Sequence, residues 1–308
     1  MLLLNTMLTI FALIGVGLLI GKKVAMTPEI KKLLIFMILN ITLPAIILNG
    51  FLEISAQENL TAKLASIFFF SLSFNILGLA LAYGMMKVFL QEREKVSDSA
   101  FLATFGNTGL IGIPLCAALF GSEGAVFAAV FDAGMCLVLW TLGVYTIQKD
   151  RKLTIGYLKK AFTAPVCAVL IGVVIVSFNL TLPIILQSFV GKLAGAATPL
   201  AMFFIGMLII TVLKEKYTIP YRAVAMPVLI KLLILPMIGI LTVLILPLQN
   251  LEPPILIIQM AMPTIATAPV VMGMYGADEK FGVVTMMTSL VISLFSVFAI
   301  FSFGIYFL

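Results

Sequence analysis

Two long apolar segments of this chain are interrupted by glycine and proline near their middles. The first carries Phe105-Gly106-Asn107-Thr108-Gly109-Leu110-Ile111-Gly112-Ile113-Pro114, and the second carries Met262-Pro263-Thr264-Ile265-Ala266-Thr267-Ala268-Pro269. Proline has no N–H and its ring clashes with the carbonyl four residues earlier, so we expect Pro114 and Pro263 to open these helices. Freed backbone survives at membrane depth only where protein or a water-filled cavity satisfies it. We therefore expect both interruptions to lie buried within a helical bundle.

Composition places the chain among the polytopic membrane proteins. Hydrophobic residues make up 62% of its 308 residues and charged residues only 10%, against about 25% charged residues in soluble domains. A spanning helix needs about 20 mostly apolar residues. Ten segments fit this requirement: Leu2–Ile20, Leu33–Phe51, Leu64–Phe89, Asp98–Phe120, Ala125–Gln148, Ala164–Asn179, Ile184–Leu213, Ala223–Pro247, Pro254–Tyr275 and Phe281–Leu308. We predict an all-α polytopic membrane protein with ten transmembrane helices.

Basic residues cluster in alternate loops. Sixteen of the 19 basic residues follow odd-numbered segments: Lys22, Lys23, Lys31, Lys32, Lys87, Arg93, Lys95, Lys149, Arg151, Lys152, Lys159, Lys160, Lys214, Lys216, Arg222 and Lys280. Cytoplasmic loops carry the excess of Lys and Arg, so these loops are expected to be cytoplasmic and both termini external, in the cell (plasma) membrane. The net charge of +6 therefore reports topology and does not indicate nucleic-acid binding.

The basic loop 149–160 separates two halves of five segments, 1–148 and 149–308. An odd number of helices in each half gives the halves opposite orientations, which is the pattern of an inverted repeat. Features recur in the same order in the two halves. The pairs are Thr42-Leu43-Pro44 with Thr198-Pro199, Asn75 with Lys231, and the interruption in segment 4 with that in segment 9. Paired interruptions of this kind point to a transporter's binding site.

The stretch from Asn107 to Leu115 resembles the helix-4 signature of the auxin efflux carrier family, which includes bacterial malate and malonate permeases and the plant PIN-formed carriers. The resemblance covers essentially the whole chain. Other stretches agree: Ala164-Pro165, Ala197-Thr198-Pro199-Leu200-Ala201 with Gly206, Lys231 with Pro236, and Met262-Pro263-Thr264.

The resemblance implies a scaffold of helices 1, 2, 6 and 7 and a transport domain of helices 3–5 and 8–10, in which broken helices 4 and 9 cross. It also implies a secondary transporter that moves a small organic anion, a carboxylate, by elevator-like alternating access. A homodimer through the scaffold helices is compatible with it. Thr267 departs from the pattern, because bacterial permeases of the family often have Asn there.

The substrate site is expected where the two interruptions meet. Its predicted substrate-binding residues are Asn107, Thr108, Gly109, Pro114, Pro263, Thr264 and Thr267. A break exposes N–H groups at the start of the following half-helix, where the dipole favours an anion. The Asn107 amide both donates and accepts, which suits a carboxylate, although it could instead cap the freed backbone. The three threonines are weaker candidates because their hydroxyls commonly bond their own helix.

Two charges lie deep within predicted spans, Asp132 and Lys231. A charge at such depth costs at least about 2.5 kcal/mol on insertion scales, so it normally faces protein or water and marks a pathway. Asp132 is the one candidate proton carrier, since the chain has no histidine. Lys231 could attract the anion. Alternatively, it could pair with Asp132 or neutralise carbonyls freed by Pro236.

Rival classes find little support in the sequence. The chain shows no catalytic constellation, and Cys116, Cys136 and Cys167 lie within apolar segments without metal-ligand or disulfide spacing. We expect no enzyme activity, cofactor or metal. A channel is expected to have repeated pore-lining charges or a filter loop, whereas inverted broken helices favour alternating access. The closest alternative is a sodium-coupled organic anion (bile-acid-like) symporter, with unwound carbonyls, Asn107, Thr264 and Asp132 around Na⁺.

Overall fold

The computed structural model describes residues 2–54, 59–90, 92, 95–148, 155–214, 221–246 and 252–307. Within these ranges the regular structure is helical, and the one β-bridge joins Gly106 to Thr264. Five basic residues used for the topology lie outside the described residues: Arg93, Lys149, Arg151, Lys152 and Lys216. Pro247 and Leu308, at the ends of two predicted segments, lie outside them too.

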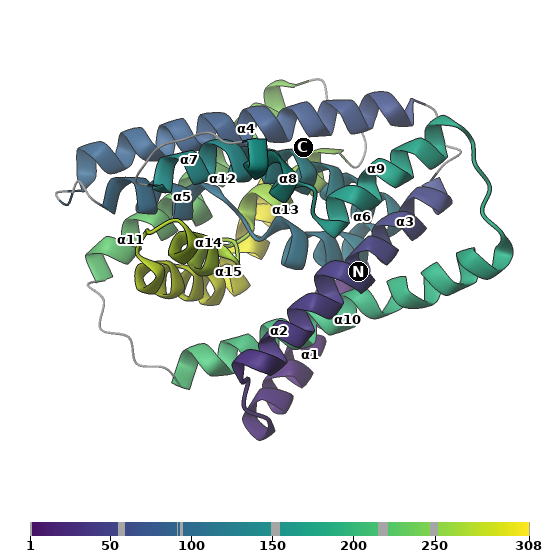
Figure 1. Cartoon of the computed structure of the whole chain (residues 1–308), viewed down its shortest axis with the longest axis horizontal. Coiled ribbons are helices and arrows are strands. Elements are labelled where there is room, and N and C mark those ends of the chain that lie inside the picture. Colours follow the sequence, from purple (N-terminus) through teal and green to yellow (C-terminus); the bar gives the residue numbers. More distant parts are fainter. Residues whose placement is uncertain are drawn as a thin grey trace. The chain divides into compact units, whose positions relative to one another are not determined.

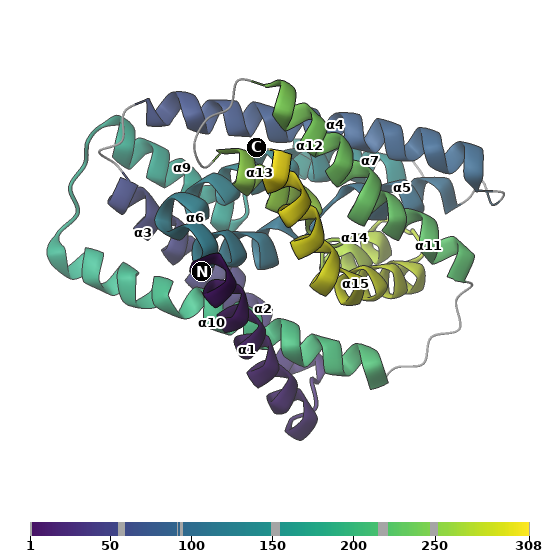
Figure 2. The ribbon, with the colours of Figure 1, turned by 180° about the vertical axis from the view of Figure 1, so that it is seen from behind.

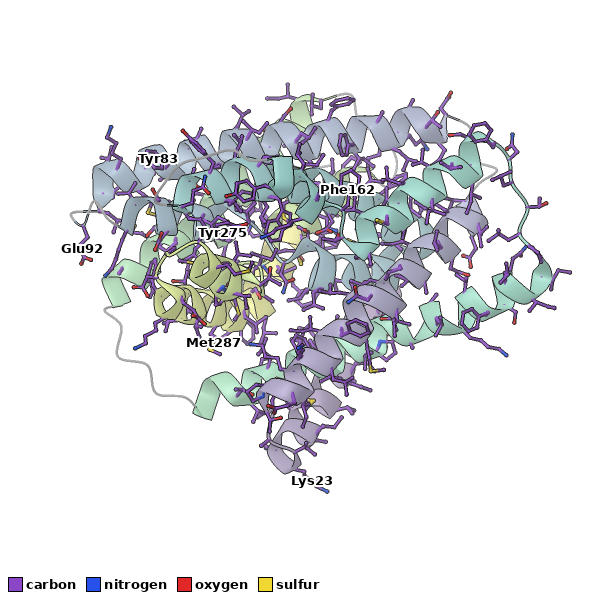
Figure 3. All side chains as sticks on the ribbon, in the orientation of Figure 1. Lys23, Tyr83, Glu92, Phe162, Tyr275 and Met287 are labelled. Atoms are coloured by element: carbon purple, nitrogen blue, oxygen red, sulfur yellow. The ribbon has the colours of Figure 1, made fainter. Side chains whose placement is uncertain are left out.

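The helices of the first half begin with α1 (Leu2–Lys23), whose exposed Lys23 ends the helix (Figure 3). The others are α2 (Pro28–Met37), η1 (Ile38–Thr42), α3 (Leu43–Ile54), α4 (Leu60–Phe89), α5 (Val96–Thr104), η3 (Thr108–Gly112), α6 (Ile113–Val138), η4 (Leu139–Gly143) and α7 (Val144–Ile147). The η elements are π-helical turns, which occur often at functional sites.

The second half continues with a short linking helix, α8 (Ile155–Ala161). It is followed by α9 (Ala164–Ser177), α10 (Ile184–Lys214), α11 (Tyr221–Leu229), η5 (Ile230–Ile234), α12 (Leu235–Ile245), α13 (Glu252–Ala261), α14 (Ala268–Met274) and α15 (Glu279–Phe307). Local sequence sets some of these ends. Thr163 begins α9 as its N-cap, since its hydroxyl accepts a 3.5 Å hydrogen bond from the Val166 N–H.

Six helical stretches in the described residues are long and apolar enough to cross a membrane: Pro28–Ile54, Leu60–Phe89, Thr108–Ile147, Ile184–Thr211, Ala223–Ile245 and Glu279–Phe307. A shorter apolar helix covers Ala164–Ser177. Gly121, with φ 65° and ψ −146°, interrupts the third stretch. The chain is therefore an all-helical, multi-pass membrane protein. Ten crossings in an inverted repeat remain a prediction.

Two structural units make up the chain. Unit 1 comprises residues 1–66, 109–130 and 163–216, and unit 2 comprises residues 67–108, 131–162 and 217–308. The predicted division at residue 148, and the predicted scaffold and transport domain, stay predictions.

In unit 1, α1 packs across α10, as Figures 1 and 2 both show. A Cβ at Gly17 would clash with the Phe203 carbonyl oxygen, and one at Gly206 would clash with the Ile14 carbonyl oxygen. Small residues let helix backbones approach closely in a membrane, so these glycines set the α1–α10 contact.

In unit 2, α4 packs on α6 through aromatic rings. The ring centroids of Phe70 and Phe74 lie 6.0 Å apart, and each lies 6.5 Å from that of Phe131. Ser71 lies between them in sequence and donates to the Phe131 carbonyl oxygen at 2.6 Å. These contacts fix the part of α6 that carries Asp132.

Candidate functional site: two facing helix interruptions

The first interruption covers Phe105–Asn107. Helix α5 ends at Thr104, Phe105 adopts an extended conformation (φ −82°, ψ 119°), and the π-turn η3 begins at Thr108. Pro114 was expected to open the helix, but it lies at the second residue of α6, beyond η3. That expectation was wrong about position. The helical stretch Thr108–Ile147 instead continues through Pro114, shortly after the π-turn η3.

The second interruption covers Met262–Thr267, between α13 and α14. Pro263 lies inside it, as expected, because its missing N–H and its ring oppose continuation of α13. Helix α14 restarts at Ala268 with Pro269 in its first turn.

The two interruptions pair with each other in unit 2. The Asn107 N–H donates to the Pro263 carbonyl oxygen at 2.7 Å, and the Ile265 N–H donates to the Phe105 carbonyl oxygen at 3.0 Å. Gly106 and Thr264 thereby form an antiparallel bridge. The N–H groups and carbonyls that each interruption frees therefore hydrogen-bond to those of the other interruption, and these bonds do not depend on water.

Lys231 belongs to η5, and its side chain reaches the C-terminal end of α5. It is 2% exposed, and its Nζ donates to the Thr104 carbonyl oxygen at 3.0 Å. A Cβ at Gly106 would lie 3.0 Å from this Nζ, so glycine leaves room for the ammonium. Lys231 therefore bonds the Thr104 carbonyl, which the first interruption frees, and not a carbonyl freed by Pro236. A cation at a helix C-terminus complements the dipole there.

Asp132 belongs to α6, and its carboxylate contacts Thr108 at the start of η3. The Thr108 hydroxyl donates to Asp132 Oδ1 at 2.5 Å, and the Cys136 thiol lies 3.7 Å from Oδ2. Asp132 is 5% exposed. Asp132 and Lys231 make no ion pair with each other. An ion pair elsewhere in the chain joins Lys95 to Glu92. The Lys231 ammonium instead lies at the C-terminal end of α5, which favours a cation, and the Asp132 carboxylate lies at the N-terminal end of η3, which favours an anion.

Thr264 is fully committed to the protein. Its hydroxyl donates to the Leu102 carbonyl oxygen at 3.0 Å, and its N–H donates to the Ser289 hydroxyl at 3.1 Å. Ser289 was missed in the sequence. The signal for it was the spacing of Thr285, Ser289 and Ser293, which share one buried face of α15.

Asn107 differs from its neighbours, because its side-chain amide makes no hydrogen bond with any residue that the structure describes. It is 5% exposed, and only its backbone N–H joins the bridge. Thr267, half-buried at the start of α14, likewise gives that helix no side-chain cap. Both side chains are therefore free to contact a ligand.

Two predicted residues lie in unit 1, Gly109 and Pro114. Gly109 lies in η3. The Pro114 carbonyl oxygen accepts a 3.2 Å hydrogen bond from the Thr198 hydroxyl of α10. Unit 2 therefore brings together Asn107, Thr108, Pro263, Thr264, Asp132 and Lys231.

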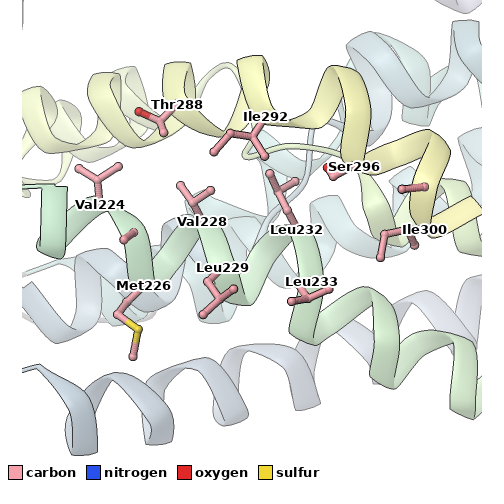
Figure 4. A pocket seen from close by; sticks show the side chains of 12 residues that line it. Val224, Met226, Val228, Leu229, Leu232, Leu233, Thr288, Ile292, Ser296 and Ile300 are labelled. Carbon is pink, nitrogen blue, oxygen red and sulfur yellow. The ribbon is translucent and has the colours of Figure 1, made fainter.

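An apolar groove of about 530 Å³ lies elsewhere in unit 2, between α11–η5 and α15 (Figure 4). Its lining includes the hydroxyls of Thr288 and Ser296 and no charged residue. It therefore lacks the charge to hold an organic anion. No three metal-ligating side chains of His, Cys, Asp or Glu come together in the described ranges either.

Known proteins that this chain matches are described as transporters. A family model described as membrane transport protein matches residues 2–155 and 149–301. An uncharacterized transporter of Methanothermobacter thermautotrophicus is 38% identical over 108 residues, which are 34% of this chain and 35% of that protein. Another, of Methanocaldococcus jannaschii, is 31% identical over 134 residues, 41% of this chain and 43% of that protein. The chain thus matches less than half the length of either relative.

The family match covers nearly all of the sequence and agrees with the apolar helices. The resemblance seen in the Asn107–Leu115 signature is confirmed. This chain belongs to the membrane transport protein family, the family of the auxin efflux carriers.

Proposed function

We propose that this membrane transporter is a secondary transporter for a small organic anion, a carboxylate. Its site is the crossing of helices 4 and 9 in a bundle of ten helices arranged as a five-plus-five inverted repeat. The observation that carries the proposal is the pairing of residues 105–107 with 262–267, beside an Asn107 amide that is free to bind.

The chemistry of the crossing suits an anion. The helices that restart after the interruptions turn their N-termini towards it, and such ends favour negative charge. The Asn107 amide would donate to one carboxylate oxygen, and the Thr267 hydroxyl at the start of α14 is a second possible donor. Thr108 and Thr264 position the site without contacting substrate, because their hydroxyls are already used by Asp132 and the Leu102 carbonyl.

An elevator-like movement would carry this site across the membrane. Helices 3–5 and 8–10 would move against a scaffold of helices 1, 2, 6 and 7. Unit 1 contains α1, α3, α9 and α10, which supports grouping those scaffold helices, although it also contains residues 109–130. A homodimer through the scaffold is part of the same proposal.

Asp132 is the residue that would couple transport to an ion. As a proton carrier it would exchange its bond from Thr108 for a proton. The second candidate is sodium coupling, in which the Asp132 carboxylate, the Thr108 hydroxyl and carbonyls of the unwound backbone would supply the oxygen ligands in place of the present hydrogen bond. Uptake into proteoliposomes with a proton gradient or a sodium gradient alone distinguishes the two.

The orientation in this proposal places both termini outside the plasma membrane. Exposed Lys23, at the end of α1 that is assigned to the cytoplasm, offers a test. A Lys23→Cys variant should react with a membrane-impermeant maleimide only after the cells are opened. Labelling from outside intact cells would reverse the topology.

The site is tested by a thermal-shift screen on the purified protein, in which small carboxylates are compared with organic cations and neutral compounds. A ligand at 100 times its Kd stabilises the folded state by about 2.7 kcal/mol. We expect at least one carboxylate to raise the melting temperature and to be transported by proteoliposomes. The proposal is overturned if stabilising ligands are cations or neutral compounds, or if a carboxylate's shift persists unchanged in Asn107→Ala.

A further inference from the structure

Aromatic rings surround one lysine at the end of α8. Lys160 Nζ lies 5.5 Å from the ring centroid of Trp140 and 5.1 Å from that of Tyr275, and it donates to the Tyr275 hydroxyl at 2.9 Å. The Tyr157 ring meets Tyr275 edge-on, with centroids 5.6 Å apart. Figure 3 labels Tyr275 within this part of unit 2. Cation–π contacts of this kind contribute about 0.5–1 kcal/mol at exposed sites, so α8 is held in a defined orientation.

The outer side of α8 combines apolar and basic residues. Leu158 is 43% exposed and Phe162, just beyond the helix, is 57% exposed. Leu158 lies in the last turn of α8 and Phe162 directly follows the helix, so these two exposed side chains form an apolar stripe at its C-terminal end. Lys159 is exposed beside that stripe. Lys160 is also exposed but is engaged by the aromatic rings, which leaves Lys159 as the other exposed cation of this helix.

The level of α8 along the membrane normal follows from its neighbours. It packs on η4, close to the end of the apolar stretch Thr108–Ile147. Trp and Tyr concentrate at the membrane–water interface, where their rings are apolar and their polar atoms reach water. Residues 149–160 hold five basic residues against one acidic residue, Asp150. Aromatic rings, exposed apolar side chains and excess positive charge therefore meet at headgroup level.

We propose that α8 is an interfacial binding surface for anionic phospholipid. Lys159 binds the phosphate of the headgroup, while Leu158 and Phe162 enter the boundary between headgroups and acyl chains. Lys160 and its aromatic partners hold the helix in this orientation. The partner is a lipid and not a soluble phosphate, because a soluble anion would leave the adjacent apolar stripe in water. The arrangement is that of an interfacial amphipathic helix with a basic face.

The experiment uses Trp140, the one tryptophan of the chain. The full-length protein is reconstituted in nanodiscs that contain equal amounts of phosphatidylglycerol and phosphatidylcholine. In one preparation only the phosphatidylglycerol carries acyl chains brominated close to the headgroup, and in the other only the phosphatidylcholine does. Bromine quenches a nearby indole, so Trp140 fluorescence reports which lipid gathers at α8. We expect stronger quenching by phosphatidylglycerol, with about fivefold local enrichment, the ratio that about 1 kcal/mol per basic residue gives.

Two single-charge variants make the assay specific. Lys159→Gln should abolish the preference for phosphatidylglycerol, whereas Lys192→Gln, at an exposed lysine of α10, should retain it. Free inorganic phosphate should not compete, whereas competition by it would identify a soluble-anion site. Equal quenching by the two lipids in the unmodified protein overturns the proposal. Equal loss of preference in both variants overturns it as well, since the effect would then be general to surface charge.

Discussion

The hydrogen bond from Thr108 to Asp132 gives the sharpest test of the charge arrangement at the helix interruption. Its O···O distance is 2.5 Å, at the short end of the range for hydroxyl donors to ionised carboxylates. A hydrogen bond to a charged group contributes about 1.5–3 kcal/mol. The other partner of Asp132, the Cys136 thiol at 3.7 Å, is a weak donor. Thr108→Val should therefore lower the free energy of unfolding by about 1.5–3 kcal/mol.

Thr104 provides a matched control within the same segment. Both threonines are 1% exposed, but the Thr104 hydroxyl donates at 2.7 Å to the Ala100 carbonyl of its own helix. Removing such a back-bonded hydroxyl leaves the helical hydrogen bonds intact, so Thr104→Val should cost about 0.5–1 kcal/mol at most. Thr108→Ser, which retains the donor, should recover most of the loss seen in Thr108→Val.

The assay is reversible unfolding in mixed detergent micelles, repeated in an Asp132→Asn background. The bond there is between neutral groups, so Thr108→Val should cost only about 0.5–1.5 kcal/mol. The difference between the two backgrounds measures the contribution of the charge. Equal losses in both backgrounds, or a Thr108→Val loss no larger than that of Thr104→Val, would refute the charged hydrogen bond.

Three further predictions concern other contacts. Asn107→Ala should leave the ligand-free melting temperature unchanged, because its amide bonds no described residue, while weakening carboxylate binding about tenfold to hundredfold; an unchanged affinity by calorimetry counts against ligand contact. Because Asp132 and Lys231 do not pair, losses of stability in Asp132→Asn and Lys231→Met should add in the double variant, and recovery in the double variant would instead show that the two charges neutralise each other structurally. Gly17→Ala should destabilise the protein by about 1–3 kcal/mol through overpacking, whereas Gly15→Ala, which meets nothing within 4 Å, should be neutral; similar melting temperatures for the two would contradict the close α1–α10 contact.

Hydropathy was enough to predict helices and membrane embedding, because a run of apolar residues has few other stable arrangements in lipid. The second interruption could also be located, since Pro263 acts through its own missing N–H. The first could not be located from Pro114. Backbone pairing of Gly106 with Thr264 sets the break upstream, and such pairing joins residues far apart in sequence.

The partners of the deep charges could not be predicted for the same reason. Depth alone identified Asp132 and Lys231 as significant. The sequence left open a pair between them, while the structure gives each a separate partner from the first interruption. Ser289 was missed because the polar face of Thr285, Ser289 and Ser293 shows no partner in the sequence, and the Thr264 N–H meets it only in the folded chain.

The separate placement of the two deep charges has an electrical consequence for the proposed elevator movement. Asp132 and Lys231 lie in the same unit and have opposite signs, so the empty carrier would move no net deep charge through the membrane field. Moving one elementary charge through 100 mV changes the free energy by about 2.3 kcal/mol. Only the step loaded with a monovalent anion would then feel the voltage, and a negative interior would favour its outward passage. A proton or Na⁺ carried along with the anion would cancel that voltage dependence, so current recorded during turnover would report the coupling directly.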